Sequence, residues 1–197
     1  MGRYTTIDLI MMKDAGTRVH TALENIGRET GGNMNRKETT KFLSDCLIHT
    51  RFGRGKYWAR EVSLDYGTSE VKRVDFMEFQ PAGVVNVSGI EKGIFISYEV
   101  KSCEADYNSG FGKNFETEKN YLVMPMQLYK KLRTEIPHNV GVICPVPVVR
   151  EIMEEFEDPT QLDAEVSWDM KVVKPAIQKG RRRSMTELLF CMLRSGH

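Results

Sequence analysis

Apolar residues recur along this 197-residue chain with two different periods. The helical period of 3.6 is found at 17–26 and again at 184–194, which predicts an amphipathic helix in each segment. Asn35 followed by Glu38 resembles a capping box and predicts the start of another helix. The buried stripe of that helix would consist of Phe42, Leu43, Cys46 and Leu47.

From residue 57 the apolar period changes to two, which is the period of β-strands. In the first strand we expect Trp58, Val62 and Leu64 to share one face, followed by a turn at 65–67. Further strands are predicted at 73–79, 93–102, 121–124 and 140–143, the last ending at Cys144 and Pro145. A helix is expected at 127–135, and a hairpin arm or loop at 81–93.

The order of these elements predicts the fold class. A strand, helix, strand succession favours an α/β fold, with a mixed central β-sheet flanked by helices. The chain has the length of one globular domain. Within it we expect an N-terminal helical extension at 1–35, a core at 36–175 and a basic C-terminal helical tail at 176–197.

The strand at 93–102 carries the candidate chemistry. Because side chains alternate along a strand, Ser97, Glu99 and Lys101 share the face opposite Tyr98. Two opposite charges at the end of an apolar strand are costly inside a sheet unless they pair or bind something. If the strand at 73–79 pairs with this one, Asp75 can meet Glu99, whereas Glu78 points away.

Two carboxylates on a rigid sheet suit Mg²⁺ or Mn²⁺, because these cations prefer oxygen ligands and accept water and phosphate at their other positions. Lys101 could orient or help deprotonate a metal-bound water. The alternative reading is a solvated salt bridge at the end of a strand, in which these charges have no catalytic role.

Asp75 and the triplet Glu99-Val100-Lys101 resemble the Asp and Glu-x-Lys signature of the PD-(D/E)XK nuclease-like superfamily. The continuation to Tyr107 is similar to the MmcB-type DNA-repair branch, including phage and prophage members. The resemblance covers roughly residues 36 to 145 and implies a restriction-endonuclease-like core. It implies that Asp75 and Glu99 hold the metal and that Lys101 positions the attacking water.

The resemblance also implies a further acidic residue from the first helix or strand of the core, for which Glu38 and Glu61 are candidates. Asp106 is a third candidate, at the start of the following helix. Each has a simpler explanation, since Glu38 suits a helix cap, Glu61 an exposed strand position and Asp106 a favourable place in the helix dipole.

The charge distribution adds candidate contacts to nucleic acid. The net charge of +1 says little by itself, but basic residues gather before the last predicted helix. Arg181, Arg182 and Arg183 could contact phosphates, although an ordinary solvated run explains them as well. Lys113 lies in the segment 110–115, which we expect near the site because it follows closely on Lys101.

The remaining composition excludes several classes of protein. Four widely spaced cysteines argue against a disulfide framework or a zinc knuckle. No apolar run is long enough for a membrane span, and the first residues do not resemble a secretory signal, so we expect a cytoplasmic protein.

These observations predict a metal-dependent DNA endonuclease or DNA-processing protein of repair or recombination. A homodimer would suit an enzyme that cuts both strands. The alternative is a non-catalytic nucleic-acid-binding or assembly module that keeps the nuclease-like fold. A purely structural phage or prophage protein is a third reading, in which the acidic stretch at 151–158 would bind a partner.

Overall fold

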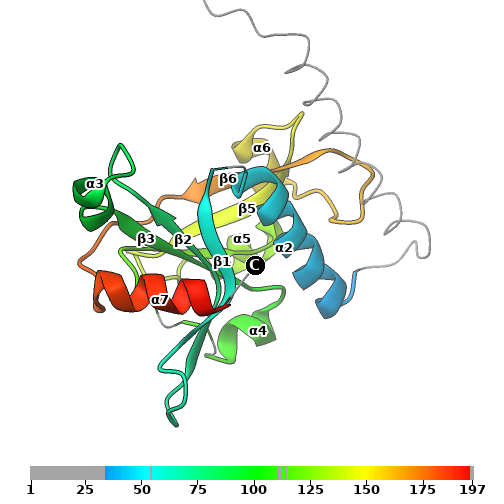
Figure 1. Ribbon diagram of the computed structural model, residues 1–197. Coiled ribbons are helices and arrows are strands. Elements are labelled where there is room, and N and C mark those ends of the chain that lie inside the picture. The colour runs from blue at the N-terminus through cyan, green and yellow to red at the C-terminus, as the bar shows by residue number, and fades with distance from the viewer. Residues whose placement is uncertain (1–33, 54, 111, 114, 196–197) are drawn as a thin grey trace, which may run out of the picture.

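The computed structural model describes residues 34–53, 55–110, 112–113 and 115–195. They form an α/β fold in which helices flank a six-stranded mixed sheet, as the sequence predicts (Figure 1). The helix predicted at 17–26, and most of the extension predicted at 1–35, lie outside the described residues.

The strands follow one another in the sheet in the same order as in the sequence. They are β1 Tyr57–Leu64, β2 Lys72–Gln80, β3 Ile94–Val100, β4 Lys119–Val123, β5 Gly141–Pro147 and β6 Trp168–Lys174. The helices are α2 Arg36–Arg51, α3 Val87–Glu91, α4 Glu104–Asn108, α5 Met126–Leu132, α6 Ile152–Glu157 and α7 Met185–Ser195. The pairs β1–β2, β2–β3 and β5–β6 are antiparallel, whereas β3–β4 and β4–β5 are parallel.

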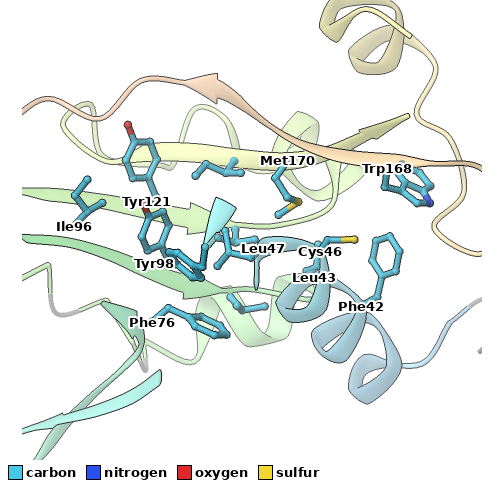
Figure 2. Close-up of a cluster of buried hydrophobic side chains, with 14 residues drawn as sticks. Phe42, Leu43, Cys46, Leu47, Phe76, Ile96, Tyr98, Tyr121, Trp168 and Met170 are labelled. Atoms are coloured by element: carbon cyan, nitrogen blue, oxygen red, sulfur yellow. The ribbon is translucent and has the colours of Figure 1, made fainter. Parts of the chain in front are cut away.

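Helix α2 begins with the predicted capping box. The Asn35 side chain accepts hydrogen bonds from the backbone N–H groups of Lys37 and Glu38, and the Glu38 carboxylate accepts one from Asn35 N at 2.8 Å. The predicted stripe of this helix is buried against one face of the sheet, where Phe42 meets Trp168 edge-on (Figure 2). The local sequence therefore fixes both the start and the buried side of α2.

The opposite face of the sheet is covered by other helices. Helix α7 packs on β1 and contributes Leu188 to a cluster that contains Met77 and Phe95. Helices α5 and α6 pack over Leu122 and Val142 in a second cluster. Because Glu99 lies beside Leu122 in the register of β3 and β4, its side chain belongs to this second face.

The expectation that Trp58, Val62 and Leu64 share one face is wrong. Trp58 stacks on Phe52 on the side of α2, whereas Val62 and Leu64 pack into the α7 cluster. The alternation breaks at Glu61, whose φ of 51° lies in the left-handed region and interrupts the regular pleat.

The same change of face occurs on β2. Regular alternation along this strand would place Val74 on the same face as Phe76, but Val74 pairs with Val62 and packs in the α7 cluster with Met77. The pleat of β2 is therefore interrupted between Val74 and Phe76, which is the position of Asp75.

Strand β5 does not end at Cys144 and Pro145 but continues to Pro147. Val148 N donates to Ser167 O on the side of β6. Because N–H groups alternate in direction along a strand, the backbone nitrogens of Pro145 and Pro147 point away from β6, toward β4. Strand β4 already ends at Val123, so the two prolines, which have no N–H group, remove no hydrogen bond from the pairing of β4 with β5.

Three elements were not predicted from the sequence. The sequence patterns predict no element at strand β6, helix α6 lies in the acidic stretch at 151–158, and α3 lies within the segment expected to be a hairpin arm or loop.

Candidate metal centre

Asp75 and Glu99 meet where the regular pairing of β2 and β3 ends. The paired residues run from Gln80 and Ile94 to Phe76 and Tyr98, and the next position along this register joins Asp75 to Glu99. The Asp75 carboxylate accepts a hydrogen bond from Val100 N at 2.8 Å, and the backbone of Asp75 acts to lower the pKa of Glu99. A side-chain hydrogen bond thus replaces the backbone pairing of the two strands at this point.

Burial makes two negative charges costly here. Glu99 is 2% exposed, and burial together with the charge of Asp75 raises the pKa of Glu99 to about 9. Burial also raises the pKa of Asp75, whereas the hydrogen bond from Val100 and the charge of Lys101 act to lower it. Lys101, itself 3% exposed, is the nearest compensating charge for both carboxylates.

Gly112 lies directly against the two charged ends. A Cβ atom added to this glycine would stand 2.4 Å from Glu99 Oε2 and 3.2 Å from Lys101 Nζ. The φ of Gly112 is +72°, which also favours glycine. The expectation that the segment 110–115 approaches the site is confirmed for Gly112.

Lys113 brings a second ammonium close to the first. Its Nζ lies 3.5 Å from the ring centroid of the buried Tyr107. Desolvation and then the charge of Lys101 lower the pKa of Lys113, so the two lysines act on the same region. A role for Lys113 in binding nucleic acid stays a prediction.

The three accessory candidates have different environments. Glu38 is occupied as the cap of α2, and the 65% exposed side chain of Glu61 pairs with Arg73 at 3.9 Å. Asp106 accepts hydrogen bonds from Ser102 N and from Arg36, and its charge raises the pKa of Asp75. Of the three, Asp106 is the one that acts electrostatically on the site.

The described residues contain no group of three or more His, Cys, Asp or Glu side chains arranged to hold a metal ion. At this site the chain can supply the two carboxylates of Asp75 and Glu99. Water and substrate oxygens could supply further ligands of a cation.

The C-terminal arginines differ in their availability. Arg181 forms an ion pair with Glu118 at 2.8 Å, and Arg183 holds both oxygens of Asp65 at 2.9 and 2.6 Å. Arg182 is exposed. Two of the three predicted phosphate contacts are therefore committed to ion pairs within the fold.

A buried polar network next to Glu99 could not be found from the sequence. Ser97 Oγ donates to Asn120 Oδ1 at 2.7 Å, and Thr117 Oγ1 lies within 3.1 Å of both side chains. All three side chains are buried on the site face. No sequence signal links them, because Ser97 is separated from Thr117 and Asn120 by 20 or more residues.

These features define an α/β protein with a candidate metal centre at the end of its third strand. No protein-family model and no curated protein matches the sequence. A solved structure with a similar fold is the SPO1766 protein of unknown function from Silicibacter pomeroyi, with a TM-score of 0.51 and 15% sequence identity. The match covers 79% of this chain and 84% of the other, and at this identity it establishes similarity of fold alone.

Within the described part of the chain, no helix has the length and apolar character required to cross a bilayer.

Proposed function

We propose that this chain is a Mg²⁺- or Mn²⁺-dependent nuclease of the PD-(D/E)XK type that hydrolyses phosphodiester bonds of DNA during repair or recombination. The observation that carries the proposal is the meeting of Asp75 and Glu99 where the regular pairing of β2 with β3 ends, with Lys101 beside them. A DNA substrate implies a cytoplasmic location. Cutting both strands of a duplex would call for a homodimer.

The arrangement of the elements supports a restriction-endonuclease-like core. Helix α2 is followed by three antiparallel strands, and the chain then crosses over to place β4 parallel to β3. Asp75 lies on β2 and Glu99 on β3, and these two strands are neighbours in the sheet.

The donor set fits a hard divalent cation. Two buried carboxylates, one of which raises the pKa of the other, gain most from a cation that replaces the proton. Both donors are oxygens, which suits Mg²⁺ and Mn²⁺ better than softer metals. When bound, such an ion would act as a Lewis acid toward a phosphate oxygen.

The residues of the chain itself would position the carboxylates, the attacking water and the substrate phosphate. The backbone N–H of Val100 holds the Asp75 carboxylate in place, and Gly112 lies against the Glu99 carboxylate, so that both are positioned before substrate binds. Lys101 would donate hydrogen bonds to the attacking water and orient it. Lys113 would neutralise a substrate phosphate on the same side.

One observation favours the alternative, a non-catalytic nucleic-acid-binding module. Lys101 already lies close to both carboxylates and offsets their charge, and the backbone of Gly112 lies against Glu99. A protein that needs only this internal compensation would bind DNA in a salt-dependent way and cut nothing.

Cleavage assays separate the two functions. Linear, nicked, branched and single-stranded DNA would be incubated with Mg²⁺ or Mn²⁺ and with wild type, Asp75→Ala, Lys101→Ala or the exposed control Glu61→Ala. The nuclease proposal predicts metal-dependent cutting by wild type and by the control alone. Equal cutting by all four preparations would reveal a contaminant, and DNA binding without cutting would favour the alternative.

A further inference from the structure

A small open cavity of about 140 Å³ lies at one edge of the sheet. Ser102, just beyond the end of β3, and Pro125, just beyond the end of β4, both line it. These strands are parallel, so their carboxyl ends meet at the same edge, where open α/β sheets commonly bind ligands. Thr39 of α2 and Pro145 of β5 contribute other parts of the wall.

One wall of this cavity is held by a buried carboxylate. Glu155 is 1% exposed and accepts hydrogen bonds from Thr160 N and Thr160 Oγ1, both at 2.8 Å. Arg150 pairs with the same carboxylate at 3.2 Å. These bonds fix the segment that supplies Gln161 to the lining, so the wall is formed before any ligand arrives.

The lining chemistry suits an uncharged polar ring. Gln127 and Gln161 supply carboxamides, and Thr39 and Ser102 supply hydroxyls, groups that both donate and accept hydrogen bonds. Among the described residues that line the cavity none is basic, whereas Glu155 and Asp163 are acidic. A phosphate would therefore be repelled, and a neutral group with N–H donors would be accepted.

The cavity adjoins the candidate metal centre. Ser102 directly follows Lys101, and the Ser102 backbone N–H and hydroxyl both donate to Asp106. The charge of Asp106 in turn acts on Asp75. A strand whose phosphate lies at Asp75 and Glu99 would thus have the cavity close by, across the end of β3.

We infer that the cavity receives one unstacked, pyrimidine-sized nucleobase from the strand being cut. A cavity of about 150 Å³ can hold one benzene ring, so the available space fits a single six-membered ring. Removing a base from the stack costs least in a single strand or at a mispaired or damaged position. The inference rests on the proposed function and names its substrate class, a strand with an unpaired pyrimidine.

The test uses oligonucleotides that carry pyrrolocytosine, whose fluorescence rises on unstacking, at one position at a time. The full-length protein is added in EDTA, where no strand is cut, and binding is followed separately by anisotropy. Gln127→Trp fills the cavity from an exposed helix position, and Gln178→Trp places the same exchange at an exposed position that does not line it. Thermal unfolding checks that both variants fold.

The inference predicts a fluorescence rise at one position with wild type and with Gln178→Trp, and loss of that rise with Gln127→Trp at unchanged DNA affinity. An equal rise with Gln127→Trp would overturn it. Binding of free cytidine without a fluorescence rise at any position of the labelled strand would also overturn it. If wild type binds and cuts DNA in Mn²⁺ yet gives no rise, the base site fails while the proposed function stands. Absence of both DNA binding and cutting would remove both proposals.

Discussion

The carboxylate of Asp75 accepts a hydrogen bond of 2.8 Å from the backbone N–H of Val100 on the neighbouring strand. A side chain therefore takes the place of a backbone acceptor at the point where β2 leaves β3. The bond ties one candidate metal ligand to the strand that carries the other. It also leaves Glu99 and Lys101 at the end of β3 with Gly112 packed over them.

The contact of Gly112 with Glu99 predicts a specific defect in Gly112→Ala. The new Cβ would displace the Glu99 carboxylate, since it would lie 2.4 Å from Oε2. Gly110→Ala is the matched control, because Gly110 has a similar φ of +77° and nothing within 4 Å of an added Cβ. The positive φ should cost each variant about 1–2 kcal/mol of unfolding free energy.

Urea denaturation and Mn²⁺ affinity would be measured for both glycine variants. We expect Gly112→Ala to lose more stability than Gly110→Ala and to bind Mn²⁺ more weakly. Equal losses in the two variants would show that Gly112 does not constrain Glu99.

The raised pKa of Glu99 predicts an unusual pH dependence of stability without metal. A carboxyl whose pKa is about 9 in the folded protein, against an ordinary 4.5, stabilises the fold fully only below the lower value. As the pH rises from 4.5 toward 9, the Glu99 contribution to the free energy of unfolding should fall by roughly 1.4 kcal/mol per pH unit.

Glu99→Gln removes this proton and keeps the shape of the side chain. Its stability relative to wild type should therefore increase with pH between pH 5 and pH 8.5, measured by urea denaturation in EDTA. Glu61→Gln, at an exposed position, should run parallel to wild type. If the stability of Glu99→Gln also changes with pH in parallel with that of wild type, Glu99 ionises in the folded protein at no cost in free energy.

The C-terminal arginines should separate into structural and binding groups. Arg183 is 13% exposed and pairs with the partly exposed Asp65 and Glu187, so Arg183→Ala should lower the free energy of unfolding. Arg182 is exposed, and Arg182→Ala should leave stability unchanged while reducing DNA affinity and its salt dependence. Urea denaturation measures stability, and DNA binding at several salt concentrations measures affinity and its salt dependence. A loss of stability in Arg182→Ala but not in Arg183→Ala would contradict the ion pairs described above.

Local patterns predicted the parts of the site that depend on neighbouring residues. Alternation along two strands placed Asp75 with Glu99 and placed Glu78 on the other face, where it contacts Tyr98. The capping box of α2 was likewise readable, because Asn35 and Glu38 interact within one helical turn. The place of Glu78 and the helix cap follow from the periods of strands and helices, whereas Asp75 meets Glu99 at the point where the alternation of β2 is interrupted.

Other features depend on contacts that no local pattern contains. Arg183 meets Asp65 across 118 residues of sequence, so its ion pair could not be distinguished from a solvated basic run. The left-handed conformation of Glu61 breaks the alternation of β1, although glutamate gives no signal for it. Strand β6 alternates apolar and charged residues, a strand signal that the sequence contains but from which no strand was predicted.

Calorimetric titration with Mn²⁺ tests the candidate metal centre most directly. Wild type and Glu61→Gln should bind Mn²⁺ at one site, more tightly at pH 8.5 than at pH 6.5 because the ion replaces the proton of Glu99. Asp75→Asn and Glu99→Gln should lose this binding while remaining folded. Equal binding by all four proteins, or none by wild type, would contradict a metal centre at Asp75 and Glu99.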